Sequence, residues 1–254
     1  MLAEKIKKHL QKLEQKKFRK DFGEFIVEGI KGTAEALKSD FDIALILIEG
    51  KRRDENEIKK IILTAEKKGI IVEYADRKDL EKISDTETFP GVLSVVVQKE
   101  FFIEDFLKEK NIIALDAVND PGNLGTIIRT ADWFGIKKII LSENSVDLYN
   151  SKVVRSTMGS IFHVDILRVN DFKRTLEKFK KENFVINSLD LNGESIEKMS
   201  FKDKNIFLFG NESHGLAAEL EKFVDKRYTI KGYGQAESLN LAISAGIVMY
   251  KIKK

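Results

Sequence analysis

The sequence predicts an α/β protein of two domains, because short apolar runs alternate with helical segments along most of the chain. A length of 254 residues, 43% of them hydrophobic, is sufficient for two modest cores. Residues 112–118 form an apolar run that is typical of a strand buried on both faces of a parallel sheet. Residues 99–110 mix aromatic and charged side chains without periodicity, as expected of a connection between domains. We therefore expect domains at residues 1–98 and 111–254, with a linker at residues 99–110.

The composition excludes several classes of protein. The chain has no cysteine and only three histidines, so we expect neither disulfides nor a zinc site, and no metal. No apolar run approaches the roughly 18 residues needed to cross a bilayer, and the first residues lack the apolar core of a signal peptide. We therefore expect a cytoplasmic protein that does not bind membranes. The net charge of +3 is too small to indicate nucleic-acid binding by itself.

Positive charge is concentrated at the start of the chain. Between residues 4 and 21, eight basic side chains face three acidic ones. Such an arm can replace condensed counterions on a phosphate backbone and bind it in a salt-sensitive way. The same segment also fits an amphipathic helix, and the two interpretations are compatible. The residues that would face inward are Leu2, Ile6, Leu10 and Leu13.

In the first domain, β-rich runs alternate with helical periodicity. Gly69 follows two lysines and is expected to terminate a helix. The expected strands are residues 25–28, 44–48, 70–74 and 91–97, and the expected helices are residues 31–38 and 54–68.

The second domain has the alternating pattern of a doubly wound parallel sheet. In such sheets, ligands bind beyond the carboxyl ends of the strands, where loops lead into helices. Three polar motifs fall at such positions. After the strand at residues 112–118, the expected strands are residues 138–141, 164–169, 184–189, 205–209 and 227–230, and the expected helices are residues 124–134, 171–181 and 238–250.

The first motif spans residues 119–129. Residues 119–123 read Asn-Asp-Pro-Gly-Asn, all turn formers, and predict a tight turn. Arg129 follows near the start of the expected helix, where a cation opposes the helix dipole unless a phosphate or carboxylate compensates it. A structural ion pair is the alternative role for Arg129.

The second motif, residues 210–215, follows a strand and contains two glycines that allow close approach of a ligand. Glu212 is placed to bond a cofactor or to orient Arg129, or only to favour the start of the next helix. We expect His214 to be a solvated loop residue. In the third motif, Ser238 has the position of an N-cap for the last helix, and Asn240 is available to hold substrate or cofactor.

The order and spacing of these motifs resemble those of the SpoU (TrmH-like) RNA ribose 2'-O-methyltransferases of the SPOUT superfamily. Residues 123–129 fit the family pattern Asn-x-Gly-x-x-x-Arg, residues 210–215 fit Gly-x-Glu-x-x-Gly, and residues 238–240 are its Ser-Leu-Asn. Residues 154–163 resemble a further family segment. Residues 25–29 resemble the ribosomal-protein L30e-like α/β domain that precedes many of these catalytic domains.

One segment departs from the family pattern. Relatives usually read Ile-Pro-Met-x-Gly where residues 230–234 read Ile-Lys-Gly-Tyr-Gly. The resemblance implies an apolar clamp on the adenine of the cofactor in this segment, and the change alters that clamp. The glycines at residues 232 and 234 lack the third glycine of a dinucleotide fingerprint, so we do not interpret them as one.

The resemblance implies an S-adenosylmethionine-dependent transfer of a methyl group to a ribose 2'-hydroxyl of RNA. It further implies a knotted catalytic domain with a C-terminal trefoil knot, and a homodimer. The front domain favours ribosomal RNA as the substrate; the alternatives are transfer RNA, or a non-catalytic RNA-binding protein with a decayed methyltransferase domain. The implied catalytic residues are Arg129, Asn123, Glu212, Ser238 and Asn240. The implied cofactor contacts are Gly210, Asn211, Glu212, Ile230, Gly234, Ser238 and Leu239. The expected RNA contacts are Lys16, Lys17, Arg19, Glu28 and Arg155.

Overall fold

The computed structural model describes residues 2–84, 86 and 88–253, and the chain divides into two compact units. The first unit contains the residues up to Lys99 together with Asp147–His163. The second unit contains Glu100–Val146 and Val164–Lys254. Each unit has its own sheet.

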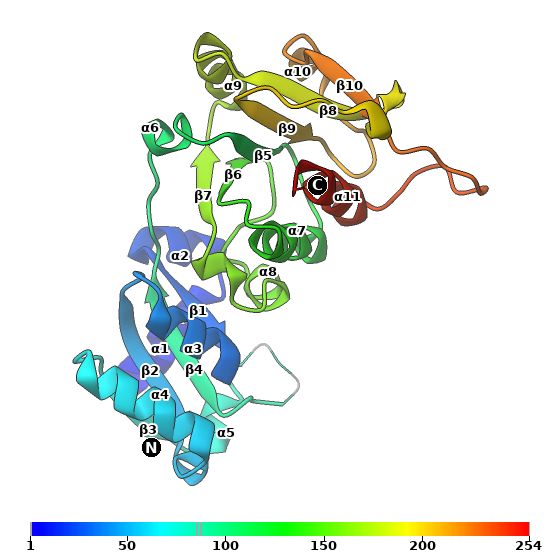
Figure 1. Cartoon of the computed structure of the whole chain (residues 1–254). Coiled ribbons are helices and arrows are strands. Elements are labelled where there is room, and N and C mark those ends of the chain that lie inside the picture. The colour runs from blue at the N-terminus through cyan, green and yellow to red at the C-terminus, as the bar shows by residue number, and fades with distance from the viewer. Residues whose placement is uncertain (1, 85, 87, 254) are drawn as a thin grey trace. The chain divides into compact units, whose positions relative to one another are not determined.

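The first unit is built on a four-stranded mixed sheet in the order β1-β4-β2-β3 (Figure 1). Strand β4 is antiparallel to both of its neighbours, whereas β2 and β3 are parallel. The four predicted strands are confirmed to within two residues at each end. Their bounds are β1 (Glu24–Glu28), β2 (Ile43–Glu49), β3 (Val72–Ala75) and β4 (Val92–Val97).

Helices cover both faces of this sheet, since successive strand residues point to opposite sides. Leu47 packs with Leu10 and Leu13 of α1 (Glu4–Leu13) and with Leu80 of α5 (Arg77–Leu80). Its neighbours Ile46 and Ile48 pack with α3 (Ile30–Lys38) and α4 (Asn56–Lys67). The amphipathic interpretation of the first helix is thus confirmed, and the basic segment continues into α2 (Lys16–Phe22). Gly69 has a φ of +69° after α4, as its predicted role requires.

Asp147–His163 belongs to the first unit although it comes from the second half of the chain. It forms α8 (Ser151–Ser156) and a short 3₁₀ helix, Ser160–Phe162. The ring of Tyr149 lies 4.4 Å from that of Phe25, and the ring of Phe162 lies 5.1 Å from that of Phe41. These contacts anchor the segment on β1 and on the residues before β2.

The second unit contains a six-stranded sheet in the order β10-β8-β9-β5-β6-β7, in which every adjacent pair is parallel. This confirms the predicted parallel sheet. The bounds are β5 (Asn111–Leu115), β6 (Lys138–Ser142), β7 (Asp165–Val169), β8 (Val185–Ser195), β9 (Asn205–Phe209) and β10 (Lys226–Thr229).

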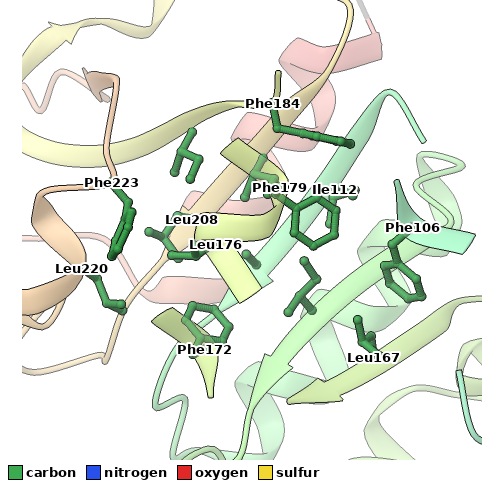
Figure 2. Close-up of a cluster of buried hydrophobic side chains, with 14 residues drawn as sticks. Phe106, Ile112, Leu167, Phe172, Leu176, Phe179, Phe184, Leu208, Leu220 and Phe223 are labelled. Atoms are coloured by element: carbon green, nitrogen blue, oxygen red, sulfur yellow. The ribbon is translucent and has the colours of Figure 1, made fainter. Parts of the chain in front are cut away.

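An aromatic-rich core lies on one face of this sheet, where α9 (Phe172–Lys181) and α10 (Ala218–Glu221) pack (Figure 2). Phe106 of α6 (Ile103–Phe106) is buried in the same core, so this part of the predicted linker packs within the second unit. The opposite face is covered by α7 (Pro121–Trp133) and α11 (Leu241–Lys253), which lie side by side (Figure 1).

The structure differs from the sequence prediction by three residues or more at five element ends, two of which are the end of β5 at Leu115 instead of residue 118 and the end of α11 at Lys253 instead of residue 250. Strand β8 continues to Ser195 rather than ending at residue 189, because its polar, turn-forming second half still pairs with β10. Helix α7 begins at Pro121, and α11 begins at Leu241 instead of Ser238. In the part of the chain that is described, no helix combines the length and the apolar character needed to span a membrane.

Candidate active site

Glu212 lies at the centre of a polar network formed by the loops that follow β5 and β9. These strands are parallel neighbours, with Leu115 opposite Phe209, so their loops leave the sheet side by side. The Glu212 carboxylate accepts hydrogen bonds from the backbone N–H groups of Asn119 (3.2 Å) and Asp120 (3.1 Å). It also accepts one from the Asn123 side-chain amide at 3.1 Å. The first two motifs therefore meet at this carboxylate.

Asn240 connects the third motif to this network. Its side-chain amide nitrogen donates to Oδ1 of Asn123 over 2.8 Å. Its own Oδ1 accepts from the backbone N–H of Ala242 at 2.8 Å, in the first turn of α11. Asn240, and not Ser238, therefore caps the last helix. The prediction for Ser238 was wrong by two residues, and asparagine is as good a cap as serine.

The first motif forms the start of a helix rather than an isolated turn. Asp120 is the N-cap of α7, and its Oδ1 accepts from the backbone N–H of Asn123 at 2.6 Å. Pro121 occupies the first helical position, where the missing N–H costs nothing. The predicted tight turn over residues 119–123 is thus corrected. An Asp-Pro pair before an apolar helix was the signal that could have placed this start.

The environment of Glu212 keeps its carboxylate charged. Partial burial acts to raise the pKa of Glu212, but hydrogen bonds from Asn123 and from nearby backbone amides outweigh it and lower the pKa. The carboxylate also lies at the N-terminus of α7, where the helix dipole favours negative charge. At neutral pH the network is therefore built around an ion.

Gly210 and Asn211 shape the loop that presents Glu212. A Cβ on Gly210 would lie 2.2 Å from the carbonyl oxygen of Gly215, so only glycine fits there. Asn211 and Gly215 exchange two backbone hydrogen bonds, and the Asn211 side chain donates to the carbonyl of Ala117 at 2.8 Å. His214 is exposed, as expected.

The predicted cofactor contacts beyond β10 are not part of the network. Ile230 is half-buried, and the following residues 231–240 are all exposed. Within the described chain, the Ser238 side chain makes no hydrogen bond, and neither Gly234 nor Leu239 contacts Glu212 through one.

Arg129 lies in the second half of α7, so it does not oppose the helix dipole at the N-terminus as the sequence suggested. Its side chain is exposed, on the same face as Thr126 and Trp133. Among residues 2–84, 86 and 88–253, it forms no hydrogen bond or ion pair. Glu212 therefore does not orient Arg129, and the structural ion pair considered for Arg129 is absent from this part of the chain.

The predicted RNA contacts all belong to the first unit. Lys16 and Lys17 are exposed on α2. Glu28, at the end of β1, accepts hydrogen bonds from the hydroxyls of Ser84 (2.6 Å) and Thr86 (3.1 Å). Arg155 is half-buried on α8.

Arg19 is the exception among the predicted RNA contacts, since only 5% of it is exposed. Its guanidinium donates twice to the Asp147 carboxylate, at 2.7 and 2.8 Å, and also to the carbonyls of Leu13 and Glu14. A guanidinium that is buried and bonded in this way is not available to a phosphate. We therefore remove Arg19 from the RNA-binding set and assign it to the interior of the first unit.

Comparison with known proteins places these observations in a family. The model of the SpoU rRNA Methylase family matches residues 110–250, and the model of the MRM3-like substrate binding domain matches residues 4–94. The chain is 32% identical to the 23S rRNA (guanosine(2553)-2'-O)-methyltransferase RlmP of Bacillus subtilis (strain 168), over 97% of this chain and 95% of that protein. It is 29% identical to the 23S rRNA (guanosine-2'-O-)-methyltransferase RlmB of Acinetobacter baylyi, over 88% and 94% of the two chains.

A solved structure shares the whole fold. The AdoMet-bound rRNA methyltransferase from Sinorhizobium meliloti matches with a TM-score of 0.87 and 30% identity, covering 99% of this chain and 95% of that one. The three motifs, the parallel sheet and these matches agree with one another. The chain belongs to the SpoU rRNA methylase family.

Proposed function

We propose that this protein transfers a methyl group from S-adenosylmethionine to a ribose 2'-hydroxyl of ribosomal RNA. The observation that carries the proposal is the hydrogen-bonded chain Glu212–Asn123–Asn240, which joins three motifs of the family across 89 and 117 residues of sequence. A network of this kind holds a site in one geometry, which is what catalysis by positioning requires.

The residues of the segment 230–240 suit the cofactor. A Cβ built on Gly232 or Gly234 meets no atom within 4 Å, so the backbone there is open to a ligand. Leu239 and Tyr233 expose apolar surface suited to adenine, although the family's proline and methionine are replaced by lysine and glycine. When bound, S-adenosylmethionine supplies a methyl group activated by its sulfonium. In our proposal Ile230, Gly234, Ser238 and Leu239 hold it, together with Gly210, Asn211 and Glu212.

Arg129 is assigned to the reacting hydroxyl. A 2'-hydroxyl is a weak nucleophile until it loses its proton, so the site must stabilise the developing negative charge and hold the oxygen in line with the methyl carbon. The guanidinium of Arg129, which has no partner among the described residues, can supply that charge. An arginine guanidinium carries only hydrogen-bond donors and cannot act as the base, so we assign the proton to a phosphate of the substrate.

The front of the chain is assigned to RNA. Lys16 and Lys17 present exposed charge to a phosphate backbone, and we keep Glu28 and Arg155 as contacts in the same unit. We propose a functional division into a substrate-binding domain of residues 1–98, related to the ribosomal-protein L30e fold, a linker of residues 99–110, and a methyltransferase domain of residues 111–254.

The trefoil knot and the homodimer belong to the same proposal. Exposed apolar side chains on α7 and α11 support a dimer through this helix pair, because Trp133 is 84% exposed and Ile243 and Tyr250 are also exposed. Analytical ultracentrifugation of the full chain tests the dimer. A monomer at micromolar concentration contradicts it.

The function is tested by measuring transfer of a labelled methyl group to purified ribosomal and transfer RNA, in parallel with calorimetric binding of S-adenosylmethionine. We expect Arg129→Ala to keep cofactor binding and to lose most of the transfer, by about 100-fold or more. Arg174→Ala is the matched control, since Arg174 is also an exposed helical arginine of the second unit.

Each of the other outcomes would indicate a different function for this protein. Transfer to transfer RNA alone would change the substrate, and absence of cofactor binding would indicate a decayed domain that only binds RNA. Unchanged turnover in Arg129→Ala would remove Arg129 from the mechanism.

A further inference from the structure

Ala117 adopts an unusual backbone conformation directly before the first motif. Its φ is +52°, a left-handed value that residues other than glycine adopt only when their surroundings impose it. Such residues concentrate at functional sites. Ala117 follows β5 by two residues and precedes Asn119, whose N–H donates to Glu212. The conformation of this turn therefore decides where that donor points.

Two serines of the neighbouring strand β6 and its following loop hold the turn. The backbone N–H of Ala117 donates to the Ser142 hydroxyl at 2.9 Å, and that of Val118 donates to the Ser145 hydroxyl at 3.1 Å. The Ala117 carbonyl accepts a hydrogen bond from the Asn211 side-chain amide at 2.8 Å. The strained residue is thus held at both its N–H and its carbonyl.

The two serine hydroxyls lie within hydrogen-bonding distance of each other. Each serine oxygen accepts a backbone N–H, and the two oxygens lie 3.2 Å apart. Each hydroxyl has a single proton to donate. Burial raises the pKa of Asp116, and a hydrogen bond from Ser142 opposes that rise. One of the two serine hydroxyls donates to the other, which links the two supports of the turn.

This chain of hydroxyls is shielded from water. Ser142 is 3% exposed, Ser145 is 7% exposed and Asp116 is 8% exposed. A buried polar cluster costs free energy unless its groups are bonded, and a bonded cluster is rigid and directional. None of these three residues is in the family motifs or in the hydrogen-bonded chain assigned above to the reaction.

We propose that Ser142 and Ser145 are positioning residues that hold the Ala117 turn and so aim the backbone donors of Asn119 and Asp120 at Glu212. The inference rests on the proposed function for its kinetic consequence. Its structural consequence is independent, because the turn is held whether or not the protein transfers a methyl group.

The structural test is hydrogen exchange of the backbone amides, measured by nuclear magnetic resonance on the full chain. In Ser142→Ala we expect the amides of Asn119 and Asp120 to exchange at least about tenfold faster, because their acceptor is no longer aligned. Ser188→Ala is the control, since Ser188 is another buried serine of the same sheet, away from the turn. Unchanged exchange at both amides in Ser142→Ala overturns the proposal.

The kinetic test uses a rescue. We expect Ser142→Ala to lower kcat for methyl transfer by about 10- to 100-fold, since small misplacements of catalytic groups have effects of this size. Adding Ala117→Gly should recover at least about a third of the loss, measured as the change in log kcat, because glycine adopts this φ without support. If Ser142 had a purely structural role, Ser142→Ala would lower stability and Ala117→Gly would not rescue kcat. An equal loss of kcat in the single and the double variant contradicts the proposal.

Failure of the two proposals is distinguishable. If the unmodified protein transfers no methyl group, the proposed function fails, and the amide exchange of Ser142→Ala still decides the role of the serines. If the protein is active and the exchange does not change, only the positioning role fails.

Discussion

The loop around Glu212 and the segment 230–239 are both assigned to one site, yet they are built in different ways. The Glu212 carboxylate has three donors from the first motif, and the tight Gly210 backbone leaves its loop little freedom. The segment 231–239 is exposed at every residue. The first region is shaped by the protein alone, whereas the second presents open backbone and apolar surface to a ligand. Substitutions should therefore act on folding in the first region and on binding in the second.

The sharpest test of this difference compares two glycines. Gly210→Ala places a Cβ 2.2 Å from the Gly215 carbonyl oxygen, which forces the Glu212 loop to move. We expect this variant to have a lower thermal transition and to lose methyl transfer by about 100-fold or more. Gly234→Ala meets no atom within 4 Å and should leave the thermal transition within about 1 °C, since it disturbs no packing. Equal effects of the two variants on stability would break the comparison.

A second test extends the comparison to the first unit, where Arg19 is as fully bonded as Glu212. Arg19→Ala leaves the Asp147 carboxylate buried without its cation, and we expect a loss of about 3–5 kcal/mol in the free energy of unfolding. Urea denaturation measures it. Lys16→Ala, on the exposed side of the same helix, should change stability by less than about 0.5 kcal/mol. A comparable loss in both variants would show that the Arg19 ion pair is not what holds Asp147–His163.

The charge of Glu212 can be tested without removing its volume. Glu212→Gln replaces one of the two carboxylate oxygens with an NH₂ group. Three donors bond these two oxygens, so at least one donor is left without an acceptor. At about 1–3 kcal/mol for an unsatisfied polar group, kcat/KM should fall by roughly 5- to 150-fold. Glu182→Gln, an exposed glutamate of the same unit, is the control. A wild-type rate in Glu212→Gln would mean that the network does not support the reaction.

In the open segment, Leu239→Ala should separate binding from folding. Leu239 is exposed, so we expect its stability effect to stay within about 0.5 kcal/mol. We expect the Kd for S-adenosylmethionine in calorimetry to rise about fivefold, because one apolar contact is lost. Tyr233→Ala is the companion variant. If neither variant changes the Kd, the segment does not hold adenine.

The smallest effect is the pH dependence of the Glu212 network. Its pKa is lowered in the folded protein from an ordinary value of 4.5, so its contribution to stability is present above that value and is lost as the pH falls through the folded pKa. We expect the difference in urea midpoint between the wild type and Glu212→Gln to be constant near neutrality and to shrink below about pH 4.5. Solvent exposure of Glu212 keeps this difference small. A difference that grows on acidification contradicts the sign.

Much of the fold of the second unit could be predicted from the apolar runs that form its strands. The apolar run at residues 112–118 indicated a parallel strand, and the neighbouring positions of β5 and β9 explain why motifs 89 residues apart in sequence meet at Glu212. Two helix starts were missed although the signals were present. Asp120 before Pro121 and Asn240 before an apolar helix are ordinary caps, but Asp120 was interpreted as part of a turn and Asn240 as a site residue.

The environment of Arg19 could not be predicted in this way. Its partner Asp147 lies 128 residues away in sequence, and a basic segment gives no sign of which of its cations is turned inward. The membership of Asp147–His163 in the first unit depends on the same long-range contacts. Side-chain pairing between distant segments is a property of packing, whereas periodicity and turn residues act locally.

The most direct measurement is site-resolved mapping of ribose 2'-O-methylation in 23S ribosomal RNA transcribed in vitro, after incubation with this protein and S-adenosylmethionine. We predict a methylated ribose that is produced by the wild type and by Arg174→Ala, and not by Arg129→Ala. Methylation of a base, or no methylation of ribosomal RNA by a folded protein that binds the cofactor, would contradict the function proposed for this chain.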